Sequence, residues 1–488
     1  MDSTSVLYSV GVATAAIWLV ATIYFCTLFV QRKILLRKFR GPFAVPMIGN
    51  IWDPNSWSLF RFLTICRKKF GKIFVIFPFS KAYLVCSDPV VVRRILSDTK
   101  VFVKGGDYKD IFSVVFGEGL VTSNGEKHKH DRGVFGKYFI KSNVSNYVTL
   151  MNTTTKAVID SHISKKLSES GGTMDLNAEH FFATLALKVF LKFSLNHTID
   201  DTSVLDSMCR AASKGSYSTG MMMMFNLPMW SIFPAVQDLH DCKKVFLGAC
   251  QSAFDDRKTA MERGECDDMD DCLTAMIREK LPQKQVEEHL MTLVCAGHDT
   301  TAFFSAFMAL VLAQNPDCQD KLRAEILGIV GDKDEITMED LSKMTYLQKV
   351  MQETLRVYAV IPLLTREASE EVTIKEANVT IPKGAVIMVP LFMMNRDPAV
   401  WKNPSAFDPD RFDGKSVEFT QAKNGFFPFG YGSRTCIGNT LALTEAGVFF
   451  THLLRKFRLE ELPGFKPLIM GGISLTTSNG VQVVLKEL

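Results

Sequence analysis

A single cysteine in a glycine-rich stretch constrains this chain more than any other feature. Cys436 lies in Phe427–Gly438, whose sequence FPFGYGSRTCIG contains three glycines and an arginine. Glycine reaches backbone angles that are costly for other residues, so the stretch predicts a tight, irregular loop around one sulfur. The pattern of Thr440–Phe457 predicts a helix, whose N-terminal dipole stabilises a thiolate just before it. Such a thiolate suits an axial iron ligand; an inert, buried cysteine is the alternative.

Composition and length favour one large domain. The chain has 488 residues, of which 47% are hydrophobic and 22% charged. A prior of roughly 150 residues per domain suggests about three domains, but no interior linker separates them. Helical patterns dominate and β-prone runs are few, so we expect a mainly α fold with a minor β region (α+β) over residues 51–488. The eleven cysteines form no Cys-x-x-Cys pair, which disfavours a disulfide framework or a structural zinc site.

The N-terminus predicts a membrane anchor. Ser3–Gln31 contains no charged residue, and about 20 apolar residues suffice to span a bilayer as a helix. We therefore expect a transmembrane helix over residues 1–30 and a basic, proline-rich hinge over 31–50. Residues 31–40 carry five basic side chains and no acid, more than the whole formal net charge of +4. This local charge indicates a membrane surface rather than nucleic acid, with the main body on the cytoplasmic side.

A cleaved signal peptide is the alternative for this segment. Its apolar region would be shorter, and positive charge would precede it rather than follow it. The anchor is therefore the preferred interpretation.

Four motifs, in the same order along the chain, resemble those of the cytochrome P450 family. The haem-binding signature Phe-x-x-Gly-x-Arg-x-Cys-x-Gly is matched at every fixed position, namely by Phe429, Gly432, Arg434, Cys436 and Gly438. Ala296–Thr301 is similar to the Ala-Gly-x-Asp/Glu-Thr-Thr motif of the long central helix. Glu353–Arg356 matches Glu-x-x-Arg, and Asn395–Phe412 matches the segment called the meander. The resemblance runs from the anchor to the last hairpin and implies the cytochrome P450 fold.

The family's haem contacts carry over residue by residue. The resemblance implies haem b, with Cys436 as the iron ligand and Phe429 packed near it. Arg132, Arg366 and Arg434 match positions that neutralise the haem propionates. His128 stands where the family usually has tryptophan, and a histidine can still donate a hydrogen bond to a carboxylate. For Arg132 and His128, an exposed basic helix face is the alternative.

The resemblance also implies a buried ion cluster of Glu353, Arg356 and Arg411. Positions i and i+3 share a helix face, so Glu353 and Arg356 can pair.

A long helix is predicted from Val286 to Gln314, with polar residues in its apolar middle. A kink or π-bulge at Ala296–Thr301 would explain them. A second transmembrane span is disfavoured by His298 and Asp299. By resemblance, Asp299 and Thr300 are the catalytic pair that binds water beside the oxygen and delivers protons. For Thr300, a hydrogen bond to the local helix backbone is the alternative.

The substrate pocket is predicted from the family's pocket loop, here Gly105–Leu120, and from segments around the haem. For each residue of that loop taken singly, ordinary packing is at least as good an explanation. The predicted pocket residues are Tyr108, Ile111, Phe112, Val115, Phe116, Val294, Ala296, Val360, Leu363, Leu364 and Ile473.

Two hairpins are expected. One joins Ile73–Phe77 to Ala82–Cys86. The other joins Ser474–Thr477 to Val481–Leu485 through the turn Asn479-Gly480. The run Met221–Met224 fits a core, a substrate channel or a membrane-dipping loop.

These features predict a haem-thiolate monooxygenase that inserts one atom of O₂ into an apolar lipid, sterol, fatty acid or xenobiotic. The chain shows no Gly-x-Gly-x-x-Gly fingerprint, and no length remains for a flavin domain. Electrons are therefore expected from NADPH–cytochrome P450 reductase, with cytochrome b5 as an optional second donor. The expected location is the endoplasmic reticulum membrane, with a single span. Two alternatives are a haem-thiolate isomerase or dehydratase, which usually lacks the acid–threonine pair, and a non-catalytic haem- or sterol-binding protein.

Overall fold

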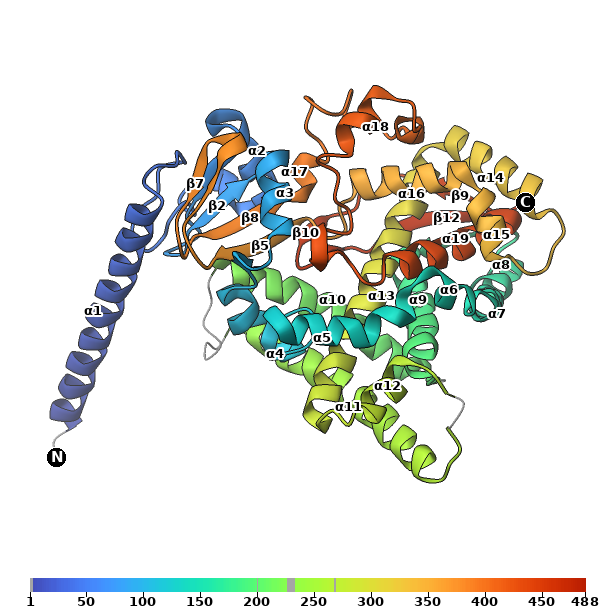
Figure 1. Cartoon of the computed structure of the whole chain (residues 1–488), viewed down its shortest axis with the longest axis horizontal. Helices are drawn as coiled ribbons and strands as arrows, with labels where there is room; N and C mark the ends of the chain where they lie inside the picture. Colours follow the sequence, from blue (N-terminus) through green and yellow to red (C-terminus); the bar gives the residue numbers. More distant parts are fainter. Residues whose placement is uncertain (1–2, 200, 226–232, 267–268) are drawn as a thin grey trace.

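A large helical body carries a β-rich region at one side, beside the N-terminal helix (Figure 1). The computed structural model describes residues 3–199, 201–225, 233–266 and 269–488. The expectation of a mainly α fold with a minor β region is confirmed. The division into anchor, hinge and catalytic domain stays a prediction.

The helical body is built around α13 (Gln283–Gln314). Its second half is buried on every side, as expected for a helix that is apolar all round. The helices packed against it include α9 (Ala178–Leu195), α10 (Thr202–Phe225), α11 (Pro234–Glu262), α16 (Thr345–Val357) and α19 (Asn439–Lys456). The helix predicted after Cys436 is present as α19. The burial of α13 identifies it as a core helix, in agreement with the rejection of a second span.

A kink or a π-bulge is expected in α13; the π-bulge is wrong, because Gln283–Gln314 is α-helical throughout, and the kink stays a prediction. Three polar side chains at the predicted break bond the helix's own backbone. His298 Nδ1 lies 3.0 Å from Val294 O, Thr300 Oγ1 donates to Ala296 O at 2.9 Å, and Thr301 Oγ1 donates to Gly297 O at 3.2 Å. Such bonds to the carbonyl four residues earlier remove the need for a break in the helix.

The main sheet has five strands in the order β1 (Ile73–Ile76), β2 (Tyr83–Cys86), β8 (Val386–Pro390), β5 (Leu363–Ala368) and β3 (Phe102–Val103). Only the β2–β8 pair is parallel. The expected hairpin near the N-terminus is confirmed, since β1 pairs antiparallel with β2. The sheet brings Arg366 on β5 beside the segment that follows β3.

The predicted C-terminal hairpin is wrong. β11 (Leu475–Thr477) pairs with β10 (Ile469–Gly471), whereas β12 (Gln482–Glu487) pairs with β4 (Thr173–Asn177) and β9 (Phe457–Glu461). Asn479 explains the first pairing, because its side chain donates to Lys466 O at 2.9 Å and accepts from Leu468 N at 2.8 Å. The turn residue thus ties the chain to the strand before β11 rather than to the strand after it.

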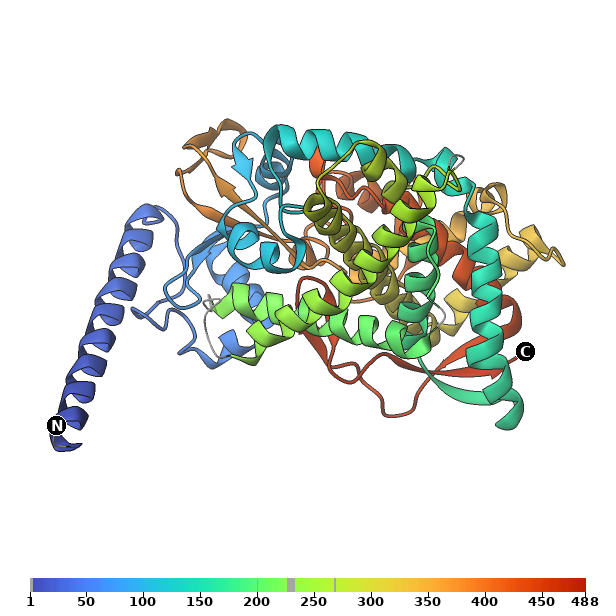
Figure 2. The ribbon, with the colours of Figure 1, turned by 90° about the horizontal axis from the view of Figure 1, so that it is seen from below.

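The N-terminal helix α1 (Ser3–Leu35) projects from the body in both views (Figure 1 and Figure 2). Its segment Val12–Leu35 has a mean hydropathy of 2.0, and only 6% of its most apolar window is buried. Its C-terminal end is docked on the body: Phe29 packs on Phe77 with ring centroids 5.2 Å apart, and Arg32 donates to Ser80 O at 2.6 Å. An exposed apolar helix at this position fits a membrane anchor.

The Met221–Met224 run forms the last turns of α10. Met222 is buried in the core, and Met223 lines a cavity described below.

The remaining elements pack around this framework. The helices are α2 (Leu59–Phe70), α3 (Pro89–Ser97), α4 (Ser113–Phe116), α5 (Gly125–Gly136), α6 (Lys141–Ser145), α7 (Val148–Ile159), α8 (Lys165–Glu169), α12 (Cys272–Arg278), α14 (Pro316–Val330), α15 (Met338–Lys343), α17 (Leu391–Met394) and α18 (Val417–Ala422). A small hairpin joins β6 (Val372–Ile374) to β7 (Val379–Ile381), and π-helical turns cover Tyr108–Phe112 and Asp160–Ser164.

Candidate functional site

The loop before α19 is held in one conformation by its backbone. Cys436 N donates to Phe429 O at 2.8 Å, which closes the loop. Gly432 has a φ of +74°, and a Cβ there would lie 2.9 Å from Ser97 Cα and 3.0 Å from Leu96 O. Both the left-handed backbone and the close contact with α3 require glycine. The loop therefore fixes the direction of the cysteine side chain.

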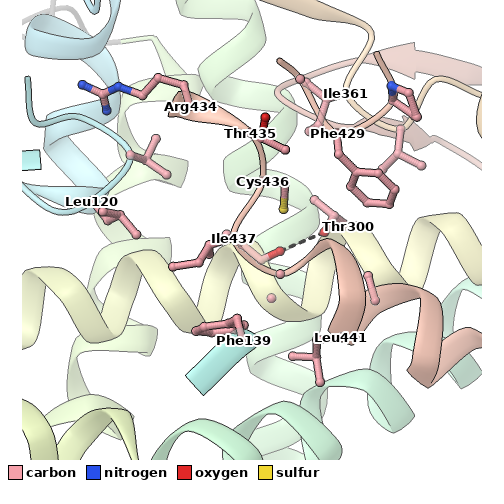
Figure 3. Close-up of a pocket in the computed structure, with 18 of the residues that line it drawn as sticks. Leu120, Phe139, Thr300, Ile361, Phe429, Arg434, Thr435, Cys436, Ile437 and Leu441 are labelled. Carbon is pink, nitrogen blue, oxygen red and sulfur yellow. Dashed lines mark hydrogen bonds between the residues drawn. The ribbon is translucent and has the colours of Figure 1, made fainter. Parts of the chain in front are cut away.

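Cys436 points its sulfur toward α13, and Thr300 lies on the facing side of the helix (Figure 3). Both residues line one cavity between the loop, α5 and α13, which we call the thiol cavity. Desolvation raises the pKa of the Cys436 thiol, while a hydrogen bond from Gly438 N–H and the charge of Arg132 act in the opposite direction. The thiol thus needs a further positive partner to become a thiolate, as a metal ion would provide.

Four predicted polar residues line the thiol cavity from three elements. Arg132 and His128 come from α5, Arg366 from β5 and Arg434 from the cysteine loop. Buried and facing the cavity, His128 does not belong to an exposed basic helix face, so that alternative is wrong for it. Burial and three neighbouring cations hold its pKa at about 4.

Sequence reasoning missed Lys104, which lines the same cavity just after β3. Burial, Arg366 and Arg434 lower its pKa well below the usual range. No motif marks this lysine; only the pairing of β3 with β5 places it beside Arg366. The described residues that line the thiol cavity include no Asp or Glu. This cation cluster is therefore built for an anionic group that is not supplied by those residues.

The structure brings Glu353, Arg356 and Arg411 together. Arg356 donates to Glu353 Oε2 at 2.6 Å and to Oε1 at 2.8 Å, and Arg411 Nε donates to the same carboxylate at 3.3 Å. Three backbone carbonyls of the meander, those of Asn395, Pro404 and Ala406, accept from Arg356. The cluster ties α16 to the segment that precedes the cysteine loop.

Asp299 and Thr300 point to different partners. Thr300 lines the thiol cavity and donates to Ala296 O, the dashed bond in Figure 3. Asp299 Oδ2 accepts from Ser474 Oγ at 2.7 Å. The two neighbouring side chains therefore have no hydrogen-bond partner in common. Burial raises the pKa of Asp299 to about 7. Proton delivery by this pair stays a prediction.

A second cavity adjoins the first and is mostly apolar; we call it the distal cavity. Cys436, Thr300, Ala296, Ile361 and Leu364 line both cavities, so the two share a wall. Predicted pocket residues in the distal cavity are Tyr108, Phe112, Val115, Phe116, Ala296, Leu363, Leu364 and Ile473. Val360 lines the thiol cavity, whereas Val294 and Ile111 are buried in the core.

Comparison with known proteins decides the family. The family model described as Cytochrome P450 matches residues 39–483. The chain belongs to the cytochrome P450 family. This P450 is 26% identical to human cytochrome P450 4X1, over 94% of this chain and 93% of that protein. It is also 26% identical to rat cytochrome P450 4A10 (94% and 92% covered) and 24% identical to the Arabidopsis thaliana protein LUTEIN DEFICIENT 5, chloroplastic (90% and 76% covered).

Membership makes this P450 a haem-thiolate monooxygenase, and its residues fit that cofactor. The thiol suits the haem iron, and the apolar cavity suits the flat porphyrin ring. The cluster of cations without acidic partners suits the two propionate carboxylates of haem.

Proposed function

We propose that this P450 hydroxylates or otherwise oxygenates an apolar small molecule that binds in the distal cavity. The wall shared by the two cavities is the observation that supports it. Cys436, which would ligate iron, and residues that would contact substrate line the same space. An apolar cavity with few polar groups suits a lipophilic ligand.

The cofactor of this proposal is haem b, held by residues of the thiol cavity. When bound, haem supplies the iron that activates O₂. Cys436 would ligate that iron, and Phe429 would pack beside the ligand. Arg132, Arg366 and Arg434 would neutralise the propionates, and His128 and Lys104 would donate hydrogen bonds to them. The raised pKa of the Cys436 thiol means that ligation releases a proton as the sulfur becomes a thiolate.

Thr300 is the proposed catalytic residue that lines the thiol cavity together with Cys436. Its hydroxyl now donates to Ala296 O at 2.9 Å. Rotation of that O–H into the thiol cavity would let it donate a proton there and accept one from water. General acid assistance of this kind contributes roughly 10²–10⁴-fold.

Electrons would come from an NADPH-dependent cytochrome P450 reductase at the endoplasmic reticulum membrane, with α1 as the anchor. The exposed apolar stretch Val12–Leu35 supports the anchor. Cytochrome b5 is an optional second donor.

A carbon monoxide difference spectrum tests the site. The reduced wild-type protein should show the red-shifted band of a thiolate-ligated haem, and Cys436→His should lose it while haem stays bound. An unchanged band in Cys436→His would show that another residue ligates the iron.

A second experiment tests the reaction. NADPH oxidation with added reductase should yield an oxygenated product from the lipid that shifts the haem band most in a binding screen. Thr300→Val should divert the oxygen to hydrogen peroxide, and Thr300→Ser, which keeps the hydroxyl, should not. Product formed without NADPH or O₂ would favour an isomerase or dehydratase. The absence of both product and NADPH oxidation would favour a non-catalytic binding protein.

A further inference from the structure

A cluster of hydrogen-bonded polar residues lies in the mostly apolar wall of the distal cavity. It joins three elements that are far apart in sequence: Ser216 on α10, Ser474 just before β11, and Asp299 on α13. Ser474 Oγ donates to Asp299 Oδ2 at 2.7 Å, and the two serine hydroxyls lie 2.8 Å apart. Ser474 N also donates to Ser216 Oγ at 3.1 Å. All three residues line the cavity.

When Asp299 is ionised, the direction of these hydrogen bonds is fixed. A hydroxyl has one proton, and that of Ser474 goes to Asp299. Ser216 must therefore donate to Ser474, so the chain runs from Ser216 through Ser474 to Asp299. Among the described residues, none donates to the other carboxyl oxygen, Asp299 Oδ1. The chain ends on an oxygen that is free for a ligand.

This polar cluster is rigid because backbones meet there without side chains between them. A Cβ on Gly220 would lie 2.7 Å from Gly472 Cα, and one on Gly472 would lie 2.7 Å from Ser216 O. Ile473 N donates to that same carbonyl at 3.1 Å. Ser216 and Ser474 are consequently held in place before any ligand arrives, which lowers the entropy cost of binding.

Charge in the cavity selects the kind of ligand. Lys104 lines the distal cavity too, but it belongs to the cluster that would contact the propionates, so Asp299 is the charged group of this cavity that is left for a substrate. A carboxylate ligand is repelled by Asp299 itself. Burial and the nearby Glu179 raise the pKa of Asp299 to about 7, so both its neutral and its ionised forms occur near neutral pH. An alcohol can donate to the ionised form and accept from the neutral one.

We propose that Asp299, positioned by Ser474 and Ser216, binds the hydroxyl group of an otherwise apolar substrate. This rests on the proposed function, and it narrows the substrate class to lipophilic alcohols. Asp299 and its serines set the orientation of the alcohol in the distal cavity, and the rest of the substrate extends along the apolar wall toward Cys436 and Thr300.

The experiment compares 1-dodecanol with its methyl ether, 1-methoxydodecane, by titrating the haem absorption band of the purified full-length protein at a pH above 8. There Asp299 is ionised and can only accept, so the alcohol should bind roughly tenfold more tightly than the ether. Asp299→Ala and Ser474→Ala should remove this preference without weakening the ether. Thr219→Val is the matched control, because the Thr219 hydroxyl lines the same cavity but bonds its own helix at Gly215 O, 2.7 Å away.

The outcomes separate this proposal from the function on which it rests. Equal affinities for alcohol and ether in the wild type would overturn it, as would a preference that survives in Asp299→Ala. Dodecanoate binding more tightly than 1-dodecanol would overturn it too. In each variant the carbon monoxide band reports an intact haem site. If the wild type shows this band but no preference for the alcohol, only the alcohol-binding role of Asp299 is refuted. If the wild type lacks the band, the proposed function is refuted.

Discussion

At the scale of single residues, the most demanding position is Arg356. It is fully buried, and its guanidinium makes two bonds to Glu353 and three to backbone carbonyls. A lysine has one nitrogen at its tip and cannot reproduce a planar fork with these five bonds. Arginine rather than positive charge is therefore what this site requires.

Replacing Arg356 by lysine should destabilise the protein by about 3–5 kcal/mol, because Glu353 is left buried and incompletely paired. Urea unfolding, together with the amount of haem retained, measures the effect. Arg458→Lys is the matched control. Arg458 also bonds a carboxylate twice, at 2.6 and 3.1 Å to Asp320, but at the surface, so its loss should stay within about 1 kcal/mol. Similar losses in the two variants would mean that burial adds nothing to the Arg356 pair.

Buried histidines make stability depend on pH, and His452 is the clearest case. Its Nε2 lies 2.7 Å from Asn152 Oδ1, and burial with nearby lysines and an arginine lowers its pKa from 6.5 to about 4. Because the folded-state pKa is the lower one, the unfolded chain binds more protons between these values. Stability is complete above pH 6.5 and falls as the pH falls toward 4.

We expect the free energy of unfolding to drop by about 2 kcal/mol more in the wild type than in His452→Gln between about pH 7.5 and about pH 5. Glutamine keeps an N–H donor toward Asn152 but does not titrate. Urea unfolding at both pH values gives the comparison. Parallel losses in the two proteins would assign the acid sensitivity to other groups.

At the scale of elements, the packing of α13 against α9 explains a glycine that the sequence pattern interprets differently. Gly297 suggests a weak point in the helix, yet the helix is regular there. A Cβ on Gly297 would lie 2.0 Å from Phe190 Cε2, on a ring that is itself buried. The glycine lets two helices approach closely next to the thiol cavity.

Gly297→Ala should therefore cost about 1–3 kcal/mol through overpacking, despite the better helix propensity of alanine. Gly328→Ala in α14 is the control, since no atom lies within 4 Å of its added Cβ, and it should stabilise by about 0.5–1 kcal/mol. Thermal unfolding of both variants measures the difference. A rise in Tm in both would show that Phe190 yields without cost.

Sequence patterns predicted the elements whose partners are local. The cysteine loop, α19 and the β1–β2 hairpin follow from glycines, periodicity and neighbouring runs. The last hairpin failed because β12 finds its partners in β4 and β9, and the distant Thr173–Asn177 gives no local signal of this. Lys104 and the Ser474–Asp299 bond were missed for the same reason: each contact joins segments that only the folded chain brings together.

At the scale of the whole molecule, α1 and the body meet at one fixed junction. Phe29 and Leu36 are buried there, and Arg32 is held by Ser80 O, while the apolar stretch beyond them stays exposed. The body is thus attached to the end of α1 that carries the basic residues. With α1 as the proposed membrane anchor, the side of the membrane on which those residues stay decides where the whole catalytic body lies.

The basic residues at the end of α1 and after it should set the orientation of the body. Lys33, Arg37, Lys38 and Arg40 follow the span without an intervening acid, so this end should remain in the cytoplasm. Protease added to intact microsomes should digest the body of the wild-type protein. The body should become protected from the protease only in a variant that lacks the basic charges. In Arg37→Gln/Lys38→Gln/Arg40→Gln, which keeps the Arg32 contact, a protected fraction should appear that becomes sensitive when detergent opens the vesicles. Full protection of the wild-type body would show the opposite orientation, because the basic flank would then have crossed the membrane with it.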